Sequence, residues 1–340
     1  MTTLSLPSLW ASLRTSAPAE TAGDFRMRLC HEVYDLRLFA AVAGESRDAS
    51  IVVEIPERLK PQRLNRISGR RLSVQAGDMT GLPAARLAIV VRLCDPEFED
   101  LFAQLGTELL AGINSAPSVE VAVQSITRLI ERWRRFLDQH RSALTGEEVR
   151  GLIGELSVLE RLIERTGSAP ALAAWRAPQR SIRDFECADR TIEVKTFLAA
   201  AGGSVMINDP MQLQPEPGVP LLLACQELGR SEHPQFTLPG HVRRLACRFA
   251  HDIKLAEDFD DAISASGYLP AHADLYTDAY SLGPLLAFVV GPDFPRIHPG
   301  TVPPGVVRVQ FALEILQLTR FRVEPDATVG PPPPPLVPQP

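Results

Sequence analysis

Short apolar runs and longer amphipathic stretches alternate along this chain of 340 residues. In its first part the apolar runs are rich in β-branched residues and are bounded by Pro, Gly or Asp, which is typical of strands. The strands predicted here are "IVVEIP" (51–56), "RRLSVQAG" (70–77) and "ARLAIVVRL" (85–93). We therefore expect residues 1–115 to form a strand-rich N-terminal domain.

Helical spacing then replaces the strand pattern. Apolar residues recur every three to four positions in 95–113 and again in 117–140, which predicts two amphipathic helices. A third helix is predicted to begin at Thr145, because Thr145 and Glu148 form a T-x-x-E capping box, and to end at Gly167.

Strand-like runs return near residue 181. They are "SIRDFEC", "TIEVKTF", "SVMIND" and "PLLLACQEL", and they are followed by a helical stretch near 239–266 and by two more strand candidates, "LLAFVVG" and "VVRVQFALEILQL". This order predicts an α/β or α+β domain over residues 116–323. The end of the chain, "GPPPPPLVPQP", cannot build a core, so we expect residues 324–340 to be a disordered Pro-rich tail.

Composition narrows the class of protein. A hydrophobic content of 45% and a charged content of 22% are those of an ordinary globular protein, and no apolar run approaches the roughly 20 residues that span a bilayer. With no leader-like pattern, we expect a cytoplasmic protein without a membrane partner. Five scattered cysteines and seven dispersed histidines argue against a disulfide framework or a zinc site. The net charge of −6 argues against binding nucleic acid by bulk electrostatics alone.

One lysine stands out, because only three of the 35 basic residues are lysines. In the predicted strand "TIEVKTF", Ile192 and Val194 point to one face, and Glu193 and Lys195 point to the other. We expect the two charged side chains to be displayed side by side, on the open face of the sheet or beyond its end. The turn "ADR" before this strand predicts a hairpin that brings Asp184 towards Glu193.

Two carboxylates and a lysine in this arrangement suit phosphodiester hydrolysis. Mg²⁺ binds through one or two carboxylates plus a substrate phosphate and lowers the pKa of an attacking water. A compact ammonium group beside that water can position it better than a guanidinium. The same residues also fit a solvent-facing hairpin with weak salt bridges, and the pattern by itself leaves both interpretations open.

The preceding helix adds a third carboxylate. In "GLIGELSVLERLI" the position of Glu155 falls among apolar positions, where an unpaired carboxylate is costly and a metal or lysine partner would resolve the cost. Gly151 and Gly154 thin the helix surface beside it and would permit close approach of a strand or a substrate. The alternative is an ordinary glutamate at the boundary of the core.

Taken in order, these segments resemble the PD-(D/E)XK motif proteins, in particular a bacterial family of phage-defence gene clusters. The resemblance spans about residues 144–297 and is carried by "GLIGELSVLERLIE", "AWRAPQRSIRDFE", "TIEVKTF", "MQL" and "GPDFPRI". It implies a restriction-endonuclease-like core, with a mixed central sheet flanked by helices, and Mg²⁺-dependent cleavage of DNA in which Mn²⁺ can substitute. The sequence departs from the motif at Arg183, which stands where the motif has proline.

The resemblance also implies roles for individual residues. Lys195 would position the attacking water, and Gln212 in "MQL" matches a glutamine that some such nucleases carry after the core strands. The implied metal ligands are Asp184, Glu193, the carbonyl of Val194 and Glu155, the last as a ligand or as the orienter of one.

Three interpretations follow from the sequence. The first is a metal-dependent endonuclease in bacterial defence, with DNA as substrate and protein partners such as an ATPase; the choice between DNA and RNA and the oligomeric state stay open. The second is a catalytically idle nuclease-like subunit that serves assembly or DNA binding. The third is an α+β binding protein with a chance motif. The basic stretches 58–71 and 128–136 are candidates for phosphate contacts.

Overall fold

The chain folds into two compact units, residues 1–141 and 142–340. The computed structural model describes residues 5–15, 20–22, 25–44, 46–61, 64, 66–68, 71–139, 143–176, 181–199, 203–233 and 236–325. The boundary between the units was predicted at residue 115 but lies after residue 141. The reason is that helix α3 (Val119–Gln139) packs against α2 (Glu99–Ser115) and so belongs to the first unit. Both helices agree with the predictions from the sequence. Most of the Pro-rich tail, from residue 326 on, lies outside the described residues.

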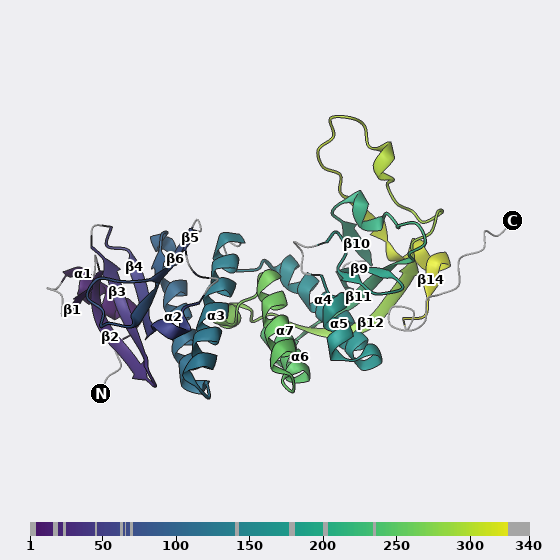
Figure 1. Ribbon diagram of the computed structural model, residues 1–340. Helices are drawn as coiled ribbons and strands as arrows, with labels where there is room; N and C mark the ends of the chain where they lie inside the picture. The colour runs from purple at the N-terminus through teal and green to yellow at the C-terminus, as the bar shows by residue number, and fades with distance from the viewer. Residues whose placement is uncertain are drawn as a thin grey trace. The chain divides into compact units, whose positions relative to one another are not determined.

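The first unit is built on a sheet that has seven antiparallel strands in the described part of the chain (Figure 1). The strands predicted at 51–56, 70–77 and 85–93 are confirmed as β4, β6 and β7, whereas β2 and β3 were not predicted. The strand order is β1 (Glu20–Ala22), β2 (Phe25–Val33), β3 (Leu36–Ala43), β4 (Ala49–Pro56), β7 (Arg86–Leu93), β6 (Leu72–Gly77) and β5 (Arg66–Ser68). Every residue of the central strand β4 is buried.

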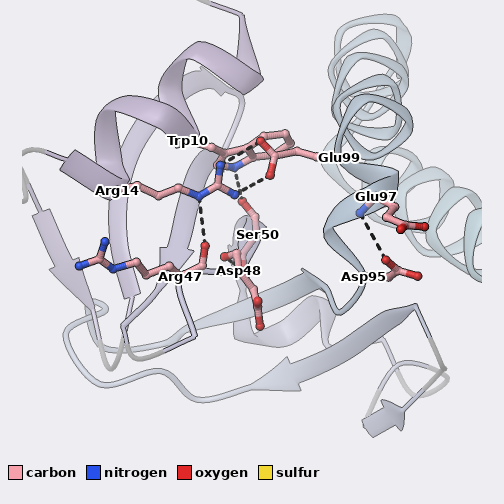
Figure 2. A network of polar contacts seen from close by, with 8 residues as sticks. All are labelled: Trp10, Arg14, Arg47, Asp48, Ser50, Asp95, Glu97 and Glu99. Carbon is pink, nitrogen blue, oxygen red and sulfur yellow. Dashed lines mark hydrogen bonds and ion pairs between the residues drawn. The ribbon is translucent and has the colours of Figure 1, made fainter.

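Helix α1 (Leu6–Thr15), which the sequence analysis missed, is held to this unit by polar contacts that Figure 2 shows. The indole Nε1 of Trp10, a fully buried residue, donates a 2.9 Å hydrogen bond to the carbonyl of Ser50. Arg14 meets the carboxylate of Glu99 through two nitrogens, at 3.0 and 2.5 Å. A paired, two-point contact of this kind fixes orientation as well as distance, so α1 is tied to both β4 and the start of α2.

The second unit is built on a mixed sheet that has five strands in the described residues, and this confirms the predicted fold class (Figure 1). Strands β9 and β11 are parallel, and the other neighbours are antiparallel. The order is β14 (Arg322–Val323), β12 (Ala279–Val289), β11 (Leu221–Ser231), β9 (Thr191–Leu198) and β8 (Phe185–Glu186).

The two faces of this sheet are covered differently. One face packs against helices α4 (Gly146–Thr166), α5 (Ser168–Ala174), α6 (Leu238–Phe249) and α7 (Ile253–Ala265). The other face, where helices were also expected, is covered by a two-stranded ribbon and a 3₁₀ helix: β10 (Ser204–Ile207), β13 (Phe311–Glu314) and η9 (Ile315–Phe321). The strand predicted at "VVRVQFALEILQL" is therefore short, because its pairing partner β10 is only four residues long.

The predicted helical stretch 239–266 is in fact two helices. The carboxylate of Asp252 accepts hydrogen bonds from the backbone N–H groups of Lys254 and Leu255, at 2.8 and 3.1 Å, and so begins α7 as a separate helix. None of the helices among the described residues combines the length and hydropathy needed to cross a membrane.

Helix α4 begins and packs as the sequence predicts. Thr145 and Glu148 make both hydrogen bonds of the capping box. A Cβ built on Gly154 would come within 2.3 Å of the methyl group of Thr196 on β9, whereas one on Gly151 would meet nothing within 4 Å. Of the two glycines noted in the sequence, only Gly154 allows a close approach between helix and strand.

These two glycines give a matched test of the packing. Gly154→Ala should lower the free energy of unfolding by about 1–3 kcal/mol, because the new methyl group must push α4 away from β9. Gly151→Ala in the same helix should leave stability unchanged or raise it by up to about 1 kcal/mol, since alanine favours the helix and meets no atom. Urea denaturation of both variants measures this, and equal effects would contradict the packing described for α4.

Candidate functional site

Strand β9 carries the two charged residues at the centre of the site. Ile192 and Val194 belong to the core on the helical face of the sheet, so Glu193 and Lys195 point to the opposite face. There the ammonium nitrogen of Lys195 lies 2.8 Å from Oε1 of Glu193. The Glu193 side chain is fully buried and that of Lys195 is 13% exposed.

The expectation that this pair is displayed on an open face was wrong. The face is covered by an apolar cluster from β11, β10 and β13 that includes Leu223 and Cys225. These two residues lie beside Glu193 and Lys195 in the parallel register of β9 and β11. The Lys195 side chain keeps only 13% of its surface exposed.

A hairpin brings Asp184 to the same place, as predicted. Phe185 pairs with Ile192 across β8 and β9, and Oδ2 of Asp184 accepts a 2.6 Å hydrogen bond from the backbone N–H of Val194. The N–H and C=O of one residue in a strand point to the same side. The carbonyl of Val194 therefore faces the edge of β9 where Asp184 lies, beyond the end of the two-residue strand β8.

Glu155 reaches the site from α4, and its partner is one that the sequence analysis did not assign. The indole Nε1 of Trp175 donates a 2.8 Å hydrogen bond to Oε2 of Glu155. Trp175 is 4% exposed and belongs to the core on the helical face. Glu155 is thus a half-buried carboxylate with a hydrogen-bond donor, next to the point where Gly154 lets α4 touch β9.

Gln212 lies in the 3₁₀ helix η5 (Pro210–Leu213) and contacts Lys195 directly. Its side-chain Oε1 accepts a 3.2 Å hydrogen bond from the Lys195 ammonium and a 3.0 Å bond from the backbone N–H of Asn208. The structure therefore brings together, around the middle of β9, all the side chains proposed from the sequence: those of Glu155, Asp184, Glu193, Lys195 and Gln212.

Burial raises the pKa of all three carboxyl groups, and the charge of Asp184 adds to this effect at Glu193 and Glu155. Burial, and then the charge of Asp184, raise the pKa of Glu193 to about 8, although Lys195 acts in the opposite direction. Burial also raises the pKa of Asp184, against the lowering effects of Lys195 and of the Val194 N–H. For Glu155, burial and Asp184 raise the pKa well above its usual value, and the bond from Trp175 offsets part of this.

Lys195 keeps its charge in this environment. Burial lowers its pKa, but the charges of Glu193 and Asp184 outweigh burial and raise the pKa overall. An ammonium group that holds its proton at neutral pH cannot act as a general base. It can orient a water molecule and stabilise negative charge.

The residues present fit a hard divalent cation such as Mg²⁺. Neither carboxylate oxygen of Glu193 accepts a hydrogen bond from the described residues, so its contact with Lys195 is an ion pair without hydrogen-bond geometry. A fully buried carboxylate in this state has oxygens left to bind a cation. Asp184 uses one oxygen for Val194, and the Val194 carbonyl points to the same edge.

The site is not a metal cage made by the protein alone. Among the residues that the structure describes, no group of three or more His, Cys, Asp or Glu side chains is arranged to hold a metal ion. Mg²⁺ does not require such a group, because it keeps several waters and is bound through one or two carboxylates together with substrate phosphate. Glu155, already bonded to Trp175, fits the role of orienter better than that of ligand.

The sequence analysis missed three residues that shape the site. Neither Trp175 nor Asn208 was singled out, and Arg183 was noted only because it replaces a proline. A buried tryptophan just after a short helix carries no sequence signal for a carboxylate partner. The signal for Arg183 was its position next to Asp184 in a strand-forming run, where a buried guanidinium must find acceptors.

The basic stretches suggested for phosphate contact are partly neutralised within the first unit. Arg58 pairs with Glu120 at 2.7 Å, and Arg132 pairs with Glu108 at 3.3 Å. Arg63, Arg66 and Arg70, which lie in the stretch 58–71, have side chains outside the described residues. Neither stretch presents an unopposed row of positive charge in the described part of the chain.

Fold and site together define a class of protein: an α+β domain whose mixed sheet carries Glu-x-Lys on a central strand, aspartate on the adjoining hairpin and glutamate on the covering helix. A family model described as "Putative PD-(D/E)XK family member" matches residues 6–316, so the chain belongs to this family. This confirms the resemblance found in the sequence. No curated protein and no solved structure matches the chain.

The raised pKa of Glu193 predicts how stability depends on pH when no divalent cation is present. Between about pH 4.5 and pH 8 the folded carboxyl group keeps a proton that the unfolded chain has lost. The free energy of unfolding should therefore fall as pH rises through this window, by about 1.4 kcal/mol per pH unit for one proton. Asp184 and Glu155 act in the same direction.

Urea denaturation in the presence of a chelator, across this pH range, measures the slope. In Glu193→Gln, which keeps the volume and a neutral side chain, the slope should be smaller by the contribution of Glu193. An identical slope in the variant and the wild type would show that Glu193 is ionised in the folded protein.

Proposed function

We propose that this protein is a metal-dependent nuclease that hydrolyses phosphodiester bonds in DNA, acting in bacterial defence against phage or foreign DNA. The observation that carries the proposal is the fully buried Glu193, whose carboxylate oxygens accept no hydrogen bond from the described residues, beside a charged lysine and the Asp184 hairpin. Membership of the PD-(D/E)XK family supports it.

The proposed roles follow from position. Asp184 and Glu193, with the Val194 carbonyl, would hold Mg²⁺, or Mn²⁺ in its place. The bound cation would supply charge stabilisation at the phosphate and a lowered pKa for water. Glu155, oriented by Trp175, would hold a water molecule or a proton beside these metal ligands.

Lys195 would orient the water molecule that attacks the phosphate. Its ammonium group is held from two directions, by Glu193 at 2.8 Å and by Gln212 at 3.2 Å, so its place is fixed before substrate arrives. Such preorganisation lowers the barrier, because the dipoles and charges need not rearrange during the reaction.

The substrate and partners extend the same proposal. DNA is the proposed substrate rather than RNA, and delivery to DNA is proposed to depend on partner proteins such as an ATPase, since a chain with a net charge of −6 has little non-specific attraction to a polyanion. An idle nuclease-like subunit is the second candidate.

Removing the lysine tests the proposal directly. Lys195→Ala should lower the rate of Mg²⁺- or Mn²⁺-dependent cleavage of supercoiled plasmid by at least about 100-fold. Folding should be retained, because a carboxyl group with a pKa of about 8 can take up a proton when its cationic partner is lost. Lys254→Ala is the matched control, since Lys254 is an exposed lysine that pairs with Asp258.

Gel assays of nicking and linearisation measure this, with circular dichroism to verify folding. Undiminished cutting by Lys195→Ala would remove Lys195 from the mechanism. Absence of cutting by the wild type with either cation, alone and with proteins encoded by neighbouring genes, would favour the idle subunit.

A further inference from the structure

Arg183 is a buried arginine that directly precedes Asp184 and bonds to main-chain carbonyls. Arg183 is only 9% exposed. One terminal nitrogen donates a 2.5 Å hydrogen bond to the carbonyl of Met211, and the other donates to the carbonyl of Gln214. These two acceptors lie on either side of Gln212 in the chain.

The segment that Arg183 holds is the one that contacts Lys195. Gln212 accepts hydrogen bonds from the Lys195 ammonium and from the backbone of Asn208. Asp209 caps the start of η5 by accepting a 2.8 Å bond from the N–H of Met211. Arg183 thus holds the backbone of η5 before and after Gln212, and the Gln212 side chain links this segment to the Lys195 ammonium.

Gln214 is held at both of its ends. Its backbone carbonyl accepts from Arg183, and its side-chain Oε1 accepts from Arg296, which lies beyond β12 in the sequence. Leu213 between these contacts is fully buried in the apolar cluster that includes Cys225, the neighbour of Lys195 in the sheet. The η5 segment is therefore fixed from the core side and from the Asp184 hairpin.

The geometry calls for arginine at this position. A buried charge is costly unless its donors are satisfied, and burial lowers the pKa of Arg183 here. The planar fork of a guanidinium can reach two separate carbonyls at once, whereas an ammonium group is a single point charge on a flexible stem. Such a fork can bridge the carbonyls of Met211 and Gln214, which flank Gln212 and Leu213.

We propose that Arg183 is a positioning residue for the site: by holding the Met211 and Gln214 carbonyls it fixes Gln212, and through Gln212 it sets the place of the Lys195 ammonium group. The effect on catalysis rests on the proposed nuclease function. The effect on Lys195 does not, because it concerns only contacts within this chain.

A double-mutant cycle tests the catalytic effect. Arg183→Met should lower kcat for plasmid cleavage by about 10- to 100-fold while leaving KM for DNA unchanged, as expected when a reacting group is misplaced. Because Arg183 acts through Gln212, adding Arg183→Met to Gln212→Ala should cause no further loss. Arg183→Lys should restore part of the activity. Arg176→Met, which removes an arginine paired with Glu186 on the same hairpin, should cut at the wild-type rate.

A second readout does not require activity. The chain has three lysines, and the other two, Lys60 and Lys254, are exposed. In protein labelled at lysine side chains, an NMR spectrum should therefore give a separate signal for Lys195. This signal should move in Arg183→Met and Arg183→Gln, neither of which adds a lysine, in the same direction as in Gln212→Ala, and it should stay in place in Arg176→Met.

The outcomes separate the two proposals. Independent, multiplicative losses in the cycle, or a Lys195 signal that moves in Gln212→Ala but not in either Arg183 variant, would overturn the positioning role. If the wild type does not cut DNA, the proposed function fails, and the NMR comparison still decides the role of Arg183. If Arg183→Met does not fold, the comparison is made with Arg183→Gln, which keeps a hydrogen-bond donor and adds no lysine signal.

Discussion

A carboxylate buried on an interior strand of a mixed sheet, β9, is the feature on which the second unit depends. An isolated buried charge would cost several kcal/mol, and Glu193 is buried among Leu223, Cys225 and the ribbon that covers them. The cost is reduced in two ways: Lys195 supplies a positive charge at 2.8 Å, and the carboxyl group keeps a proton up to about pH 8. Even so, neither carboxylate oxygen of Glu193 accepts a hydrogen bond from the described residues.

The surrounding elements supply the remaining groups from separate directions. Gly154 lets α4 touch β9, and this brings Glu155 to the strand. The Asp184 hairpin is locked to the edge of β9 by the Val194 N–H, and η5 reaches Lys195 through Gln212. Polar groups from α4, from the Asp184 hairpin and from η5 thus surround one buried carboxylate. They have no evident role in stability, since apolar residues would fill the same space at a lower cost in free energy. Their convergence is the reason for assigning function to this part of the sheet.

Much of this could be predicted from the sequence, and the limits have physical causes. The capping box located α4, and the alternation in "TIEVKTF" placed Glu193 and Lys195 on one face, because both signals are local. The burial of that face was not predictable, since it depends on a ribbon formed by β10 and the distant β13. The partner of Glu155 depends on Trp175, which is aimed by tertiary packing. Helix α1 was missed because its stabilising contacts, Arg14 with Glu99 and Trp10 with Ser50, join residues far apart in the chain.

The most direct test of the central claim is calorimetric titration of the protein with Mg²⁺ and with Mn²⁺ near pH 7, in two buffers of different ionisation enthalpy. Because Glu193 has a pKa of about 8 and a ligand carboxylate must be ionised, binding should release close to one proton. Binding in Glu193→Gln should be much weaker and should release no proton from this group. Cation binding of equal strength in the wild type and the variant, or no binding of either cation, would contradict the assignment of Asp184 and Glu193 as a metal site.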